Sequence, residues 1–135
     1  MRERTNLIAA QLLGELEYWC SHFYEQVQPH CYSPVECLLG AAIMAAFKMA
    51  VPIELCTQEQ ATRSKASLVL IPQFKWTNYR IDWVVNITRL KSPHVFIECD
   101  GHDFHERTKE QAAHDKKRDR AIQASNIPIM RFTGS

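Results

Sequence analysis

The spacing of apolar residues changes at Leu68, and this change limits the possible folds more than any other feature of the chain. Before Leu68, apolar residues recur every three or four positions, which is the period of an amphipathic helix. After it come short runs rich in β-branched and aromatic residues, which are typical of strands. Both patterns in one chain predict a sheet flanked by helices, in the α/β class with an α+β leaning.

Two helices are predicted before Leu68. The first covers residues 5–27, and its apolar stripe consists of Leu7, Ile8, Leu12, Leu13, Leu16, Trp19 and Phe23. The second begins at Ser33-Pro34-Val35-Glu36, which reads as an N-cap, a first-turn proline and a capping-box glutamate, and it ends at Pro52. Its expected buried stripe is Val35, Leu38, Leu39, Ala42, Ile43 and Ala46, with Gly40, Ala41 and Ala45 allowing close packing. Residues 57–67 are polar and predict a loop.

Four strands and one more helix are predicted after Leu68. Residues 68–76, 79–87 and 94–99 are expected to form a meander, with Thr77-Asn78 as a tight turn. A helix over 107–125 and a last strand over 127–132 follow. Because that strand is reached through a helix, we expect it to lie parallel to the strand at 94–99. The predicted order is α-α-β-β-β-α-β.

The length of 135 residues predicts a single domain, with 1–32 as a helical extension and 33–132 as the core. The chain stops directly after an apolar strand, so we expect a truncated or short C-terminus. The longest apolar stretch is interrupted by Lys48, Pro52 and Glu54, which argues against a membrane partner. Five cysteines at irregular spacings predict reduced thiols in the cytoplasm, and the pattern of a structural zinc site is missing.

Three carboxylates lie within or at the end of two strongly apolar strands. Asp82 lies between Ile81 and Trp83, while Glu98 and Asp100 end the next strand and point to one face of it. If the two strands pair, all three acids converge, and like charges at that distance repel unless a cation is present. Carboxylate oxygens suit Mg²⁺ or Mn²⁺, which can activate water for attack on a phosphodiester. The alternative is that Asp82 pairs with an arginine and the other two are surface acids.

A basic segment follows these acids. Residues 107–120 contain the basic residues Arg107, Lys109, Lys116, Lys117, Arg118 and Arg120 against Glu110, Asp115 and Asp119. A basic excess beside carboxylates fits a polyanionic substrate, although a solvated helix face has the same composition. Arg118 and Asp119 are equally well explained by an ion-pair network on the helix surface with Asp115, one turn away, that docks the helix on the sheet. His102 and His105, after Gly101, could supply a general base or a phosphate contact, or be ordinary surface residues.

Several stretches together resemble the PD-(D/E)xK nuclease superfamily. These are residues 79–82, 97–102, 115–122 and 129–132, with 33–36 and 72–73 fitting the branch of very-short-patch-repair endonucleases and related domains of unknown function. The resemblance covers about residues 33–132. It implies a restriction-endonuclease-like mixed sheet flanked by helices, with Asp82 and Glu98 as metal ligands and the Cys99 carbonyl as a third oxygen. Glu36 would be the acid of the preceding helix, although capping explains it equally well.

The chain departs from the family motif at Asp100, where the motif has lysine. Such a lysine would orient water or stabilise charge on the phosphate, so another basic group must take that role. We expect the catalytic set to be Asp82, Glu98, Asp100, Glu36, His105 and Lys116, with Asp82, Glu98, Asp100 and the Cys99 carbonyl at the metal. The expected nucleic-acid contacts are His102, Arg107, Lys109, Lys116, Lys117 and Arg120.

The sequence therefore predicts an Mg²⁺- or Mn²⁺-dependent endonuclease that hydrolyses DNA phosphodiester bonds, with DNA favoured over RNA. Two alternatives stay open. One is an inactive nuclease-fold module that binds nucleic acid through the basic helix. The other is a partner-binding subunit of a defence or mobile-element system, as a dimer, which an exposed apolar stripe in residues 5–27 would support.

Overall fold

The computed structural model describes residues 2–89, 94–100 and 108–133. Its elements are α1 (Arg2–Val27), η1 (Gln28–His30), α2 (Pro34–Lys48), β1 (Ile53–Leu55), α3 (Gln58–Ala61), β2 (Leu68–Trp76), β3 (Tyr79–Ile87), β4 (Val95–Asp100), α4 (Lys109–Ser125) and β5 (Ile129–Thr133). The strands form one mixed sheet in the order β1-β2-β3-β4-β5, which confirms the predicted fold class.

The centre of the sheet is the predicted meander. Strands β2, β3 and β4 pair antiparallel, while β1 lies parallel to β2 and β5 parallel to β4. The parallel placement of β5 confirms the expectation drawn from its crossover helix. Strand β1 and helix α3 were missed, because β1 is only three residues long and α3 is a polar single turn within the predicted loop. Thr57 and Gln60 form the capping box that stabilises this turn.

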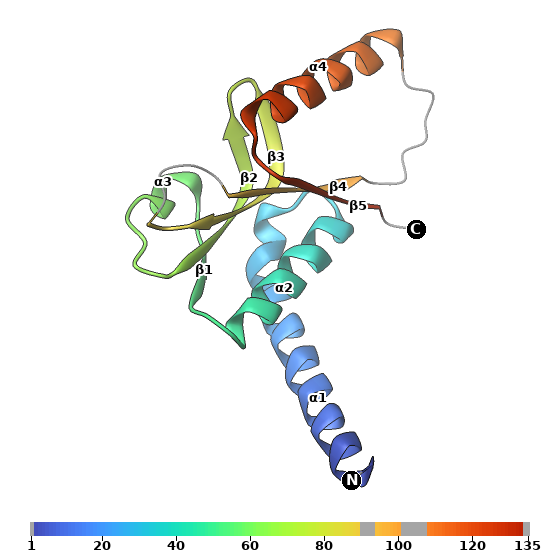
Figure 1. The fold of residues 1–135 in the computed structure, drawn as a ribbon, viewed down its shortest axis with the longest axis vertical. Coiled ribbons are helices and arrows are strands. Elements are labelled where there is room, and N and C mark those ends of the chain that lie inside the picture. The colour runs from blue at the N-terminus through green and yellow to red at the C-terminus, as the bar shows by residue number, and fades with distance from the viewer. Residues whose placement is uncertain (1, 90–93, 101–107, 134–135) are drawn as a thin grey trace.

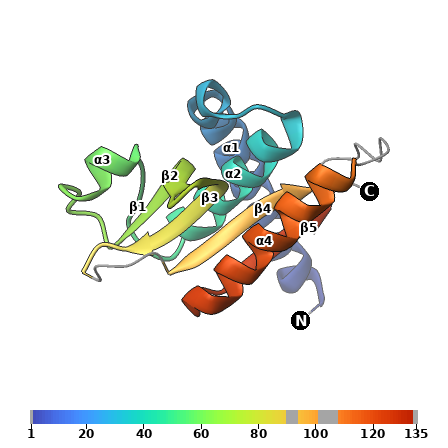
Figure 2. The ribbon, with the colours of Figure 1, turned by 90° about the horizontal axis from the view of Figure 1, so that it is seen from above.

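Helices cover both faces of the sheet (Figures 1 and 2). Helices α1 and α2 lie on one face, where the core includes Phe23, Val27, Met44 and Trp83. Helix α4 lies on the other face, over a core of Val69, Ile71, Ile81, Val84, Phe96 and Ile122. Among the described helices, none has the length and apolar content needed to cross a membrane.

The face that α2 buries differs from the predicted one. The buried positions are Glu36, Cys37, Gly40, Ala41, Met44 and Ala45, whereas Leu38 is 62% exposed and Ala42 and Ala46 are exposed. Apolar residues occur all around this helix, so their period does not select one face. Tertiary packing selects it instead: a Cβ at Gly40 would lie 2.3 Å from Cζ2 of Trp83, so the small residues face the sheet.

Only the second half of α1 packs against the rest of the domain, and its first half projects away (Figure 1). Phe23 and Val27 are buried and Trp19 is partly buried. The other members of the predicted stripe, Leu7, Ile8, Leu12, Leu13 and Leu16, are 36–72% exposed. The stripe is therefore a core surface at one end and an uncovered apolar surface at the other.

Candidate active site

Strands β3 and β4 separate next to Asp82. They pair at Trp83↔Ile97 and at the two positions that follow in β3, and this ladder does not extend to Asp82. Instead, Oδ2 of Asp82 accepts a hydrogen bond from the backbone N–H of Cys99, at 2.8 Å. The Asp82 carboxylate thus takes the place of a main-chain acceptor where the two strands part. In the sequence it lies between two apolar strand residues, Ile81 and Trp83.

Strand β2 is irregular at the same level. Gln73 has a φ of 49°, in the left-handed region, and it lies opposite Asp82 between the pairs Pro72↔Trp83 and Phe74↔Ile81. A residue with a side chain adopts this conformation at a cost of roughly 1–2 kcal/mol. Backbone strain of this kind concentrates at functional sites, where surrounding contacts hold it in place. Here the holding contact is a hydrogen bond from Nε2 of Gln73 to Oε2 of Glu36, at 3.0 Å.

Glu36 is buried at the start of α2. Its Oε2 also accepts the backbone N–H of Tyr32 at 3.0 Å, and its Oε1 accepts the hydroxyl of Ser33 at 3.1 Å. The predicted capping box is only half formed: Ser33 caps the N–H of Glu36, but the carboxylate of Glu36 bonds to Tyr32 rather than to the Ser33 N–H. Ser33 therefore caps the helix, while Glu36 ties its start to Tyr32 and to β2.

Glu98 faces α4 and is almost completely buried, at 4% exposed. Its Oε2 lies 3.3 Å from Nη2 of Arg118 in α4 and 3.5 Å from Nε of Arg131 in β5. These are ion-pair distances, yet no donor in the described part of the chain makes a well-aligned hydrogen bond to that oxygen. Nε of Arg118 is likewise buried without a described hydrogen-bond partner. Oε2 of Glu98 thus has two cationic side chains nearby and can still accept a hydrogen bond.

The environment disfavours the charged form of both strand acids. Burial raises the pKa of Asp82, the hydrogen bond from Cys99 lowers it, and the charge of Glu36 raises it again. Burial also raises the pKa of Glu98, against the lowering effect of Arg118 and Arg131. The charge of Asp100 raises the pKa of both groups. Asp82, Glu98 and Asp100 therefore influence one another electrostatically, and Glu36 acts on Asp82 as well, while the convergence of the three strand acids on one cation stays a prediction.

Within the described residues, no group of three or more His, Cys, Asp or Glu side chains is arranged to hold a metal ion. Charges influence one another's pKa over distances well beyond the roughly 2 Å of a magnesium–oxygen bond. The mutual pKa effects of these acids are therefore compatible with the lack of a preformed metal-binding group among the described residues. Carboxylates and main-chain carbonyls are the oxygen ligands that hard divalent cations prefer, and Oε2 of Glu98 makes no hydrogen bond within the described residues. The metal ligands stay a prediction.

The predicted basic residues divide into three groups. Lys109, Lys116, Lys117 and Arg120 are exposed on α4. His102, His105 and Arg107 lie outside the described residues. Ion pairs of Arg118 and Asp119 do dock the helix on the sheet, but the partners described are Glu98 of β4 and Arg131 of β5 rather than residues of the helix itself. The basic side chain of α4 that reaches the buried acids is thus Arg118 rather than Lys116.

Gln73, Arg118 and Arg131 were not predicted as site residues. A usable signal existed for Arg118, which precedes Ile122 by one helical turn and therefore lies on the face of α4 that packs on the sheet. For Gln73 the signal was its place after Pro72 in the stretch that fits the nuclease branch. Nothing in the local sequence places Arg131 beside Glu98, because that contact depends on the pairing of β5 with β4.

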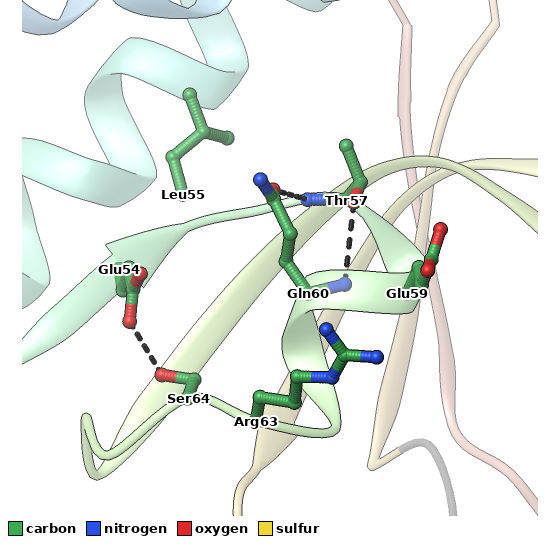
Figure 3. A pocket seen from close by; sticks show the side chains of 7 residues that line it. All are labelled: Glu54, Leu55, Thr57, Glu59, Gln60, Arg63 and Ser64. Carbon is green, nitrogen blue, oxygen red and sulfur yellow. Dashed lines mark hydrogen bonds between the residues drawn. The ribbon is translucent and has the colours of Figure 1, made fainter.

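Two hollows lie near the β1 side of the sheet. The larger, of about 560 Å³, is bounded by Glu54, Arg63, Ser64 and the capping box of α3, and none of the predicted site residues lines it (Figure 3). The other, of about 350 Å³, includes Gln73 and Tyr32 in its lining, and both are hydrogen-bonded to Glu36.

Comparison of the chain with protein-family models, curated proteins and solved structures gave no significant match. The resemblance to the PD-(D/E)xK nucleases therefore stays a prediction.

Proposed function

We propose that this domain is an Mg²⁺- or Mn²⁺-dependent endonuclease that hydrolyses DNA phosphodiester bonds. The supporting observation is the pair of carboxylates on adjacent strands, the partly buried Asp82 and the buried Glu98, whose Oε2 makes no hydrogen bond within the described residues. Burial of ionised carboxylates is costly unless a cation compensates it. Asp82, Glu98 and the Cys99 carbonyl would hold the cation, with Asp100 as a further acid beside them.

The bound cation would polarise the phosphodiester and lower the pKa of a bound water. The chain's own residues fix the surroundings. The Cys99 N–H orients Asp82, and Glu36 fixes Gln73 opposite it. Arg118, whose Nη2 lies 3.3 Å from Oε2 of Glu98, would replace the missing motif lysine and would stabilise charge on the phosphate rather than act as a base. His105 stays the proposed proton acceptor.

The exposed cations of α4 complete this proposal. Lys109, Lys116, Lys117 and Arg120 all lie on the solvent side of the helix whose inner side carries Arg118. A DNA backbone that reaches Arg118 would pass these side chains, which would contact its phosphates without reading sequence. The five free thiols agree with the proposed cytoplasmic location.

The test is cleavage of plasmid and single-stranded DNA with Mg²⁺, Mn²⁺ or EDTA. Asp82→Asn and Glu98→Gln are expected to lower the rate by at least about 100-fold, because each removes a charged ligand of the cation. Glu54→Gln is the matched control, since Glu54 is an exposed acid of the same sheet. Cleavage that persists in EDTA, or in both site variants, would contradict the proposal.

The role of Arg118 can be tested separately. Arg118→Ala is expected to lower kcat by about 100-fold, with partial recovery in Arg118→Lys, as for other groups that stabilise transition-state charge. Lys116→Ala is expected to weaken DNA binding with little effect on kcat. The reverse result would return the catalytic role to Lys116.

One observation favours an inactive nucleic-acid-binding module as the second candidate. Glu98 already has two arginines at ion-pair distance, and such pairs can hold a buried carboxylate without a metal. This candidate is expected to bind DNA with a steep salt dependence and to show no cleavage with any metal.

We also propose that the domain forms a homodimer through the projecting half of α1. Leu7, Ile8, Leu12 and Leu13 are each 47–72% exposed there, and soluble proteins rarely leave a contiguous apolar surface uncovered.

A further inference from the structure

Tyr32 is an exposed aromatic residue that is held in place from two directions. Its backbone N–H donates to Glu36, and its hydroxyl accepts a hydrogen bond from Nη1 of Arg80 at 3.0 Å. The guanidinium of Arg80 lies over the ring, 5.6 Å from its centroid. The side chain is nevertheless 75% exposed. The result is a fixed aromatic face beside a guanidinium, both open to solvent.

This face borders the hollow of about 350 Å³, which Tyr32, His30, Thr57, Gln58, Pro72 and Gln73 help to line. Its wall is built by specific contacts. The Gln58 amide donates to the carbonyl oxygen of Lys75 at 3.1 Å and accepts the Lys75 N–H at 3.0 Å, which fixes α3 against β2. The hollow, of about 350 Å³, is therefore an open space with a mixed polar and apolar lining held by these contacts.

Two residues that line the hollow are hydrogen-bonded to Glu36. Oε2 of Glu36 accepts from both Tyr32 and Gln73, and Gln73 lies opposite Asp82 in the sheet. A group bound against Tyr32 would therefore lie next to the place where the proposed reaction occurs. An exposed aromatic ring binds flat π systems by stacking, and a guanidinium binds phosphate.

We infer that Tyr32, Arg80 and this hollow form a subsite for one unpaired nucleotide next to the scissile phosphate. The base stacks on Tyr32 at the mouth of the hollow, and Arg80 binds the adjoining phosphate. This rests on the proposed function and deepens it, since it assigns the substrate class: DNA with an unpaired nucleotide, because a paired base cannot leave the duplex without loss of its stacking and pairing energy.

The experiment measures binding of labelled oligodeoxythymidine by fluorescence anisotropy in EDTA, beside an oligomer of equal length with an abasic site in place of each base. Tyr32→Ala is expected to weaken binding of the oligothymidine by about tenfold, the effect of losing one stacked base, and to leave the abasic oligomer unchanged. Tyr32→Phe keeps the ring and is expected to retain most of the affinity. Tyr18→Ala is the matched control, since Tyr18 is 62% exposed on α1, away from the hollow.

The outcomes separate this inference from the proposed function. Equal affinities of Tyr32→Ala and Tyr18→Ala for oligothymidine, in a protein that still cleaves DNA with metal, would overturn the subsite and leave the nuclease proposal standing. Equal weakening with both oligomers would also overturn it, because the loss would not involve a base. A folded wild-type protein that neither binds nor cleaves DNA would refute both.

Discussion

At the scale of single residues, Gly40 is where α2 comes closest to the sheet. The absence of a side chain there lets the ring of Trp83 lie directly against the helix, and the indole N–H of Trp83 donates to the carbonyl of Glu36 at 3.2 Å. The same contact places the start of α2, and with it Glu36, over β3. A stability experiment can therefore test how the candidate site is positioned.

Gly40→Ala is expected to lower the free energy of unfolding by at least about 1–3 kcal/mol, because its Cβ would clash with the packed ring of Trp83. Gly14→Ala is the control: nothing lies within 4 Å of a Cβ there, so the better helix former should raise stability by about 0.5–1 kcal/mol. Urea denaturation measures both. Equal effects of the two substitutions would contradict the packing described.

Asp82 is expected to lower the stability of the metal-free protein, because burial raises its pKa and so disfavours its charge at neutral pH. Asp82→Asn keeps an oxygen for the Cys99 N–H and removes the charge. At pH 7 in EDTA we expect Asp82→Asn to raise the free energy of unfolding by about 1 kcal/mol, because replacing an unfavourably placed functional group commonly stabilises a protein by this amount. Saturating Mg²⁺ should stabilise the wild type only. A less stable variant in EDTA would show that the charge is favourable.

Cys56 gives a pH dependence away from the carboxylates. Burial, followed by the charge of Glu54, raises the pKa of its thiol to about 11. A folded-state pKa above the unfolded value means a stabilising contribution that is present below about pH 8.5 and is lost as pH rises towards 11. Cys56→Ala should therefore show a flatter loss of stability between these pH values. Parallel wild-type and variant curves would contradict this expectation.

At the scale of elements, α4 is attached to the sheet by few side chains. Among the described residues of α4, only Ile122 is buried. Ion pairs of Arg118 with Glu98 and of Asp119 with Arg131 add further contacts to the sheet. The helix brings Arg118 to Glu98, so its docking determines the charge around the candidate site.

Ile122→Ala is expected to lower the free energy of unfolding by about 2–4 kcal/mol and to increase amide exchange across α4, because it leaves a cavity where the helix packs. Ile87→Ala serves as the control, since Ile87 is 36% exposed at the end of β3 and should cost less. Denaturation combined with hydrogen exchange measures both effects. A similar cost for the two isoleucines would mean that α4 is held mainly by its ion pairs.

At the scale of the whole molecule, the projecting half of α1 carries an apolar surface that the described part of the fold leaves uncovered (Figure 1). Leu13→Lys is expected to shift the protein from dimer to monomer, because it places a charge in the apolar surface proposed to pair. Leu38→Lys is the matched control: Leu38 is 62% exposed on α2, against 66% for Leu13. Sedimentation equilibrium over a range of concentrations measures the change. A monomeric wild type would refute the dimer.

The long elements could be predicted from sequence because their signals are local. Strands β2 and β3 are runs rich in β-branched and aromatic residues, and α4 is followed by Asn126 in the left-handed conformation that such a residue tolerates. Asp82 and Glu98 could be proposed for the same reason, since an acid inside an apolar strand is conspicuous. Strand β1 exists only because β2 lies beside it, and three residues carry no period of their own.

The sequence by itself determined the class of fold, the order of its long elements and the two strand acids, because these follow from residue type and spacing within short segments. The tertiary structure alone decided which face α2 buries, that Gln73 lies opposite Asp82, and that Arg118 and Arg131 meet at Glu98. Each of these depends on the distance between segments far apart in the chain. Packing against Trp83 and pairing of β5 with β4 set those distances, and neither is encoded in a local pattern.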